Sequence, residues 1–385
     1  MGINSSEADL PARIPETGIL YLTVSRTETW TLLCSETRRI GLDHYEPFSD
    51  VWAVHVTAAQ LAQLASVWLE AIPVVDLENS KCLLTCSIEQ PSNAELMQAQ
   101  SLAVLIDWVN SQWLKELIEE GRLLTHFQPI VCSAQPHVVY GYECLLRGQN
   151  TNGSLINPYQ LYTVARRAGI LDHLDDAARL KAIESAVRSR LDTRVFVNFN
   201  PRSISDPYRS LESALGAALA STNCPENYVF EVVESDEMSD TGALLEIAEH
   251  IRMAGCRVAL DDVGAGYNSL NLISLLKPEL IKLDMCMIRD VHRDSYKARV
   301  TSKLLDLARE LRIQTVVEGV ETSCEWRWAC DHGADFAQGF LFARPAENPP
   351  KSNFTSKGVR EPGGSEDESP PSESRTNNFT GELAV

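Results

Sequence analysis

Between His126 and about Arg344 the chain alternates short apolar runs, typical of β-strands, with longer amphipathic runs, typical of helices. We expect helices at residues 159–168, 175–190, 210–220, 241–254, 297–311 and 324–331. The strands are expected at residues 126–131, 138–145, 194–199, 228–233, 257–261, 280–283, 314–317 and 335–339. This order predicts an α/β fold, a (β/α)8 TIM-like barrel. Because the link between the first two strands is too short for a helix, they are expected to form a hairpin, so the barrel is a modified one.

Two adjacent carboxylates, Asp261 and Asp262, end an apolar run and are followed at once by a glycine-punctuated loop at residues 263–267. Holding two carboxylates together where a buried strand ends is unfavourable unless cations neutralise them. The same pattern is also an ordinary way to leave a strand and turn. This fragment alone therefore leaves a metal site and a plain turn open.

Polar side chains recur where the other expected strands end. In such a barrel the C-terminal strand ends gather at one opening, where the reactive groups lie. Carboxylates and an amide, without histidine or cysteine nearby, favour Mg²⁺ or Mn²⁺. A pair of such ions about 4 Å apart suits displacement at a phosphodiester. The residues at these ends are Glu143, Asn198, Glu231, Glu234, Asp261, Asp262, Lys282, Asp284, Glu318, Glu321 and Gln338.

Eight short motifs follow one another in this part of the chain. They are FQPI from Phe127, YECLLR from Tyr142, VNFNP from Val197, EVVES from Glu231, DDVGAGY from Asp261, IKLD from Ile281, VEGVET from Val317 and QGFLFARP from Gln338. Over residues 123–345 the chain resembles the EAL-domain family, bacterial phosphodiesterases that open cyclic di-GMP to linear pGpG. The resemblance implies an EAL-type barrel, two Mg²⁺ or Mn²⁺ ions as cofactors and cyclic di-GMP as the ligand.

The resemblance also implies a role for each matching residue. A first metal ion would be held by Glu143, Asn198, Glu231 and Asp261, and a second by Asp261, Asp262 and Glu318. Lys282 would lie beside the attacking water and Glu318 would assist its deprotonation, which makes the catalytic set Glu143, Asp262, Lys282 and Glu318. Glu234 would anchor the loop at residues 262–268. The nucleotide site would be lined by Gln128, Arg147, Asn198, Asp284, Glu321 and Gln338.

Three residues depart from the family's usual pattern. Cys144 stands where alanine is usual, and its side chain should point away from the metal because strand neighbours alternate. Val263 and Ala265 replace a usual phenylalanine and threonine, which would loosen the loop and weaken the second metal site. We therefore expect reduced or more tightly regulated activity. The alternatives are a cyclic di-GMP receptor without turnover and a protein-interaction module, which would not need so many converging carboxylates.

The barrel is expected to occupy residues 121–346. Residues 1–92 predict a small α/β or α+β domain with a regulatory role, with strands at 18–24, 30–34, 51–56 and 82–88 around a helix at 57–71. Residues 93–120 carry an apolar stripe from Leu102 to Leu117 and predict a helix that connects the domains or caps the barrel. Residues 347–385, rich in Pro, Ser, Gly, Asn and Glu, predict a disordered tail.

The net charge of −19 argues against binding to nucleic acid polymers or to anionic membranes. No apolar run approaches the roughly 18 residues that span a bilayer, and residues 1–13 lack the features of a secretory signal. The 10 cysteines include no C-x-x-C pair and are typical of buried, reduced thiols. From the resemblance we expect a bacterial cytoplasmic homodimer in cyclic di-GMP signalling, the pathway that regulates biofilm formation and motility.

Overall fold

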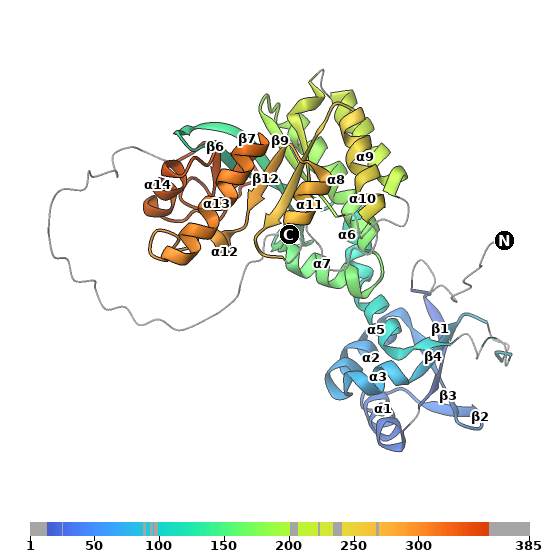
Figure 1. Cartoon of the computed structure of the whole chain (residues 1–385). Coiled ribbons are helices and arrows are strands. Elements are labelled where there is room, and N and C mark those ends of the chain that lie inside the picture. Colours follow the sequence, from blue (N-terminus) through green and yellow to red (C-terminus); the bar gives the residue numbers. More distant parts are fainter. Residues whose placement is uncertain are drawn as a thin grey trace. The chain divides into compact units, whose positions relative to one another are not determined.

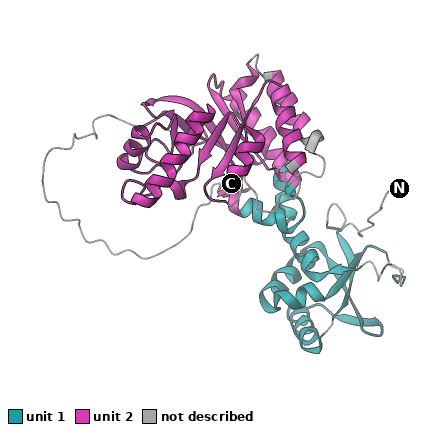
Figure 2. Cartoon of the chain, viewed as in Figure 1, with its two compact units in different colours: residues 1–121, 160–171 teal, residues 122–159, 172–385 magenta. Residues whose placement is uncertain are grey.

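The structure is a computed structural model that divides the chain into two compact units (Figures 1 and 2). Unit 1 comprises residues 1–121 and 160–171, and unit 2 comprises residues 122–159 and 172–385. No helix in the part of the chain that the structure describes is long and apolar enough to cross a membrane. The described residues are 14–24, 26–87, 90–92, 95, 99–200, 207–221, 224–233, 241–266 and 269–353.

Unit 1 is built on a five-stranded antiparallel sheet in the order β2-β3-β1-β4-β5. Helices α1, α2, α3 and α5 cover one face of this sheet, where Leu20 and Leu22 of β1 pack with Trp68 of α2. Ile19 and Tyr21 belong to a second apolar cluster, because neighbouring strand residues point to opposite faces. The elements are β1 (Thr17–Thr23), α1 (Thr27–Arg39), β2 (His44–Phe48), β3 (Val51–Thr57), α2 (Ala58–Ala71), α3 (Val74–Asn79), β4 (Lys81–Thr85), β5 (Gln100–Ser101), α5 (Leu102–Asn110) and α6 (Gln112–Glu119).

The strand predicted at residues 30–34 is wrong, because these residues lie inside helix α1. Their tryptophan, threonine and leucine side chains suit a strand as well as a helix. The buried residues of α1 include Thr29, Leu33 and Thr37, which recur every four positions and so form one helix face. This period over 13 residues outweighs the local strand propensity of a five-residue run.

Residues 102–119 form two helices rather than one continuous helix, and Ser111 lies between them. The Ser111 hydroxyl donates a hydrogen bond of 2.7 Å to the carbonyl oxygen of Trp108, which ends α5 locally. The apolar stripe is occupied within the chain, since Leu102, Ile106 and Val109 pack in the core of unit 1. The stripe therefore gives no independent support for a homodimer.

Unit 2 contains a closed barrel that all eight predicted strands form, four of them with the predicted bounds. Strand β6 pairs antiparallel with both β7 and β14, which confirms the predicted hairpin, and the other neighbours in the ring are parallel. The remaining elements of the chain are β6 (Leu123–Cys132), β7 (Gln135–Gln149), β8 (Leu155–Ile156), α7 (Pro158–Arg167), α8 (Leu171–Arg188), β9 (Arg194–Phe199), α9 (Pro207–Ser221), η2 (Pro225–Asn227), β10 (Tyr228–Val233), α10 (Thr241–Met253), β11 (Arg257–Val263), α11 (Ser269–Leu276), β12 (Leu280–Leu283), α12 (Met285–Ile288), α13 (Ser295–Leu311), β13 (Gln314–Val317), α14 (Ser323–Asp331) and β14 (Phe336–Gln338).

The barrel interior is layered. Seven apolar side chains form one buried layer: Ile130, Phe196, Val229, Ala259, Leu280, Val316 and Phe336. Because inward-facing residues recur every second position, the next layer lies two residues further along each parallel strand. That layer is polar and consists of Asn198, Glu231, Asp261, Lys282, Glu318 and Gln338. The strand period thus delivers these side chains to the C-terminal mouth of the barrel.

Residues 347–353, which the composition assigned to the tail, contact the barrel. The Tyr142 hydroxyl donates to the carbonyl oxygen of Pro350 over 3.1 Å, and the Asn353 amide donates to that of Phe342 over 2.8 Å. Residues 354–385 of the expected tail lie outside the described residues.

Gly141 of β7 packs where an added side chain has no room. A Cβ atom there would lie 2.7 Å from the Arg194 carbonyl oxygen and 2.9 Å from the Phe196 ring. We expect Gly141→Ala to destabilise the barrel by about 1–3 kcal/mol, because the neighbouring strand must shift. As a control, Gly216→Ala in α9 meets open space and should stabilise by up to about 1 kcal/mol. Thermal unfolding checks both, and equal midpoints for the two variants would contradict the expectation.

Candidate active site

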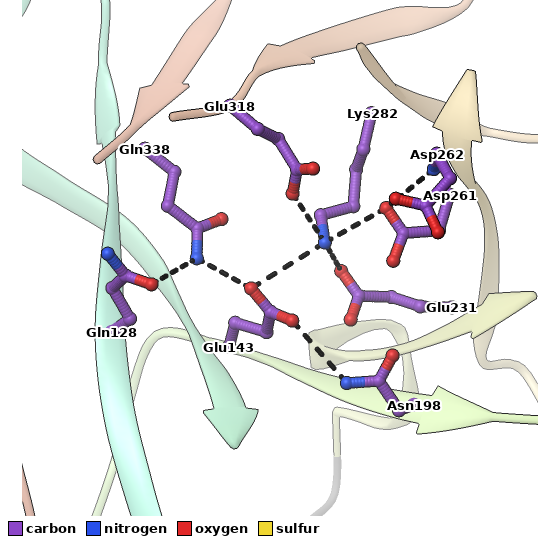
Figure 3. A network of polar contacts seen from close by, with 9 residues as sticks. All are labelled: Gln128, Glu143, Asn198, Glu231, Asp261, Asp262, Lys282, Glu318 and Gln338. Atoms are coloured by element: carbon purple, nitrogen blue, oxygen red, sulfur yellow. Dashed lines mark hydrogen bonds and ion pairs between the residues drawn. The ribbon is translucent and has the colours of Figure 1, made fainter. Parts of the chain in front are cut away.

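Four carboxylates surround the buried ammonium group of Lys282, whose exposed fraction is 1% (Figure 3). The Lys282 Nζ atom lies 2.7 Å from Glu318 Oε1 and 2.8 Å from Glu231 Oε1. It lies 3.2 Å from Asp261 Oδ1 and 3.6 Å from Glu143 Oε2. Glu143, Glu231, Asp261 and Lys282 lie on four different strands, and Glu318 directly follows a fifth, β13, so the cluster exists only when the barrel is closed.

Amide side chains orient Glu143 from both sides. Gln338 Nε2 donates to Glu143 Oε2 over 2.5 Å and to Gln128 Oε1 over 3.1 Å. Asn198 Nδ2 approaches Glu143 Oε1 at 3.4 Å, so the amide oxygen of Asn198 is the atom left for a cation. The structure thereby brings together Gln128, Glu143, Asn198 and Gln338, four of the residues expected to line the site.

The paired aspartates reach the same side of the sheet through an irregularity in β11. The register between β11 and β12 shifts between Leu260 and Val263, and Asp262 has a left-handed φ of 56°. The Asp262 amide donates to Asp261 Oδ1 over 2.9 Å, which fixes the bend. Val263 then returns to the core with no exposed surface, so the unusual valine still anchors the start of the loop.

Burial dominates the electrostatics of the cluster. It raises the pKa of Glu231, Glu318 and Asp261; Lys282 opposes this rise and the neighbouring carboxylates add to it. Burial and the adjacent Asp261 carboxylate raise the pKa of Asp262 to about 7. Burial by itself would lower the pKa of Lys282, but the surrounding carboxylates raise it well above its usual value. The site is therefore short of positive charge.

A divalent cation fits this donor set. One oxygen each of Asp261, Asp262 and Glu318 lies within 4.8 Å of the others, the spacing of ligands around one ion. Both Glu231 oxygens are buried and accept no hydrogen bond within the described part of the chain, although Lys282 forms an ion pair with one of them. The donors are carboxylate and amide oxygens, which hard cations prefer.

The other predicted site residues lie outside this network. Arg147 is half-buried on β7, Asp284 caps α12 by accepting the Cys286 amide at 2.8 Å, and Glu321 pairs with Arg289 at 2.7 Å. Cys144 packs in the apolar core around the barrel, away from Glu143's network. The proposed loop anchor Glu234 lies outside the described residues.

A family model described as the EAL domain matches residues 111–345, more than half of the chain. The chain belongs to the EAL family. Within it, YECLLR from Tyr142 supplies the name-giving triplet at Glu143, Cys144 and Leu145.

Relatives of this EAL protein include cyclic di-GMP enzymes. The bifunctional diguanylate cyclase/cyclic di-GMP phosphodiesterase MucR of Pseudomonas aeruginosa is 29% identical over 265 residues, 68% of this chain and 37% of MucR. The cyclic di-GMP phosphodiesterase PdeR of Escherichia coli is 28% identical over 244 residues, 62% of this chain and 36% of PdeR. The chain thus spans little more than a third of the length of these curated relatives.

Among solved structures, a standalone EAL protein of Vibrio cholerae in its cyclic di-GMP-bound form matches with a TM-score of 0.54 and 32% identity. The match covers 60% of this chain and 95% of that chain. The barrel of unit 2 is therefore an EAL fold.

Proposed function

We propose that this EAL protein is a metal-dependent phosphodiesterase that hydrolyses cyclic di-GMP to linear pGpG. The observation that carries the proposal is the cluster of five buried or half-buried carboxylates, Glu143, Glu231, Asp261, Asp262 and Glu318, with Lys282 as its cation. The curated names of MucR and PdeR and the bound ligand of the Vibrio cholerae protein support cyclic di-GMP as the substrate.

The proposed metal ligands are the cluster carboxylates and Asn198. Glu143, Asn198, Glu231 and Asp261 would hold one Mg²⁺ or Mn²⁺ ion, and Asp261, Asp262 and Glu318 a second. Bound ions of this kind lower the pKa of a water and offset the charge of a phosphodiester.

The remaining roles fall to side chains of the chain itself. Hydrolysis forms a bond from the water oxygen to phosphorus and breaks the bond to the leaving ribose oxygen, which takes up a proton. Lys282 would orient the water with its ammonium group, and Glu318, 2.7 Å from that group, would accept the water's proton. The Arg147 guanidinium would pair with a phosphate, and Gln128 and Gln338 would contact the nucleotide.

The direct test is to incubate the purified full chain with cyclic di-GMP and Mn²⁺ or Mg²⁺ and to separate the products by chromatography. We expect pGpG with metal and none with a chelator. Tight binding of cyclic di-GMP without pGpG would instead identify a receptor. Failure to bind or hydrolyse the dinucleotide would refute the proposal.

Metal affinity is expected to depend on pH. Asp262 has a pKa of about 7, so below that pH its carboxyl group carries a proton that a metal ion must displace. The apparent Mn²⁺ affinity of the metal-free protein should therefore fall about tenfold per pH unit for each proton released as the pH drops below about 7. Titration calorimetry in buffers of different ionisation enthalpy measures both the affinity and the proton release. An affinity that does not change between about pH 6 and about pH 8 would contradict this expectation.

We further propose that residues 1–92 are regulatory, that the protein is a homodimer and that it acts in bacterial cyclic di-GMP signalling. The mass of the full chain in solution tests the homodimer. A change in hydrolysis rate after substitutions in the core of unit 1, with the barrel still folded, would support regulation.

A further inference from the structure

His126 of β6 lies on the strand face that lines the barrel. Gln128 and Ile130 occupy this face, Gln128 in the polar network and Ile130 in the apolar layer, and His126 precedes Gln128 by two positions. Because β6 runs antiparallel to its neighbours, earlier residues lie nearer the mouth. His126 therefore lies closer than Gln128 to the opening through which a ligand enters.

Strand β7 and the segment after Ala346 place two charged residues beside His126. In the β6–β7 pairing His126 lies opposite Leu145 and Leu124 lies opposite Arg147, so the guanidinium is a diagonal neighbour of the imidazole. Phe127 and Ala346 exchange two backbone hydrogen bonds of 2.7 Å and 3.1 Å. This antiparallel bridge puts Glu347 across from His126. The imidazole is thus flanked by Arg147 and by the exposed carboxylate of Glu347.

The His126 ring is available to a ligand. The side chain is half-buried, and its nitrogens make no hydrogen bond to any residue that the structure describes. Burial and the nearby Arg147 lower the pKa of His126, against the opposing effect of Glu347. An uncharged imidazole beside a guanidinium still offers one N–H donor. A histidine in the core would instead be enclosed and hydrogen-bonded to the protein.

We infer that His126 is a further substrate-binding residue, which donates an imidazole hydrogen bond to the phosphate of cyclic di-GMP that is not attacked. Arg147 would bind the same phosphate from the neighbouring strand, and the two donors would fix the outer half of the dinucleotide. The inference rests on the proposed function, because it takes cyclic di-GMP as the ligand. It adds a contact outside the metal cluster, at a residue that directly precedes the FQPI motif.

The test compares His126→Phe, which keeps a ring but removes the donor, with His126→Gln, which keeps an N–H donor. His137→Phe is the matched control, since His137 is an exposed histidine of the same hairpin at the other end of the barrel. For the full chain with Mn²⁺ we expect His126→Phe to raise KM for cyclic di-GMP about 10- to 100-fold with kcat nearly unchanged. His126→Gln should recover most of this loss. Mn²⁺ affinity, measured without substrate, should be unaffected in all three.

The possible outcomes distinguish failure of the proposed function from failure of the role assigned to His126. If wild type neither binds nor hydrolyses cyclic di-GMP, the proposed function fails and the role of His126 fails with it. If wild type hydrolyses the dinucleotide and His126→Phe keeps the wild-type KM, only the His126 assignment is overturned. A lower kcat at constant KM, or weaker Mn²⁺ binding, would also overturn it. If wild type binds without turnover, the same fold-change is expected in the dissociation constant measured by calorimetry, and equal constants would overturn the assignment.

Discussion

Replacement of Glu143 by glutamine is expected to reduce hydrolysis of cyclic di-GMP at least about 1,000-fold, or roughly 4 kcal/mol in the barrier. Glutamine keeps the shape of the side chain but removes a charge that a metal ion needs. The metal-free variant should nevertheless be as stable as wild type or more stable. Of the four carboxylates paired with the Lys282 ammonium, Glu143 is the farthest, at 3.6 Å, and it adds to the repulsion that raises the pKa of Glu231 and Glu318.

Glu279→Gln is the control, because it should lower stability without lowering activity. Glu279 receives hydrogen bonds from Arg252 at 2.8 Å and from the Val258 amide at 2.9 Å, at the end of the barrel remote from the strand C-termini. This variant should lose about 1 kcal/mol of stability while keeping wild-type kcat. Product chromatography measures the activity of both variants, and thermal unfolding measures their stability. A Glu143→Gln protein that retains more than about a tenth of wild-type activity would contradict the role assigned to Glu143.

Much of the barrel follows from the sequence because each strand carries a local signal. Two short, mainly apolar runs are bounded by polar loops, and the structure has strands with the same bounds. These runs are Arg194–Phe199 and Leu280–Leu283. The period of two then implies that Asn198 and Lys282 share the inward side with the residues two positions before them. Their convergence needs no information beyond strand order and barrel closure.

What the sequence missed depends on contacts between distant segments. Nothing local shows that Lys282 forms four ion pairs, because three of its partners lie on other strands and the fourth, Glu318, directly follows β13. Asp284 and Glu321 match motifs equally well, yet one caps a helix and the other pairs with Arg289. The position of His126 beside Glu347 requires the bridge between Phe127 and Ala346, which are 219 positions apart.

Helix α1 shows how a short stretch of sequence can predict the wrong secondary structure. The five residues from Trp30 to Cys34 suit either secondary structure, and only the wider window that includes Thr29 and Thr37 favours the helix. Ser111 is a similar case, since side-chain hydrogen bonds from Ser111 and Gln112 to the Trp108 carbonyl oxygen mark the end of a helix that the apolar stripe would continue. Short windows and local capping contacts thus limit the sequence prediction in unit 1.

Replacement of Lys282 by methionine is expected to have the largest effect on stability. It leaves Glu143, Glu231, Asp261 and Glu318 around a buried position with no cation, which should cost about 3–5 kcal/mol and lower the melting temperature of the metal-free barrel by about 6–20 °C at about pH 8. Lys303→Met is the control: this exposed lysine pairs only at the surface with Asp306, and its removal should leave the melting temperature almost unchanged.

The pH dependence distinguishes loss of charge balance from loss of packing. The cluster carboxyl groups have raised pKa values in the folded protein, and without the ammonium these values rise further. The folded state then binds more protons than the unfolded chain, so stability falls as the pH rises from about 4 through the raised pKa values. We therefore expect Lys282→Met to lie much closer to wild type at about pH 5.5 than at about pH 8 in the presence of a chelator. Mn²⁺ should raise the melting temperature of the variant more than that of wild type, because the ion replaces the missing positive charge. If the melting temperature of Lys282→Met falls equally at both pH values and does not respond to Mn²⁺, Lys282 acts only by filling space.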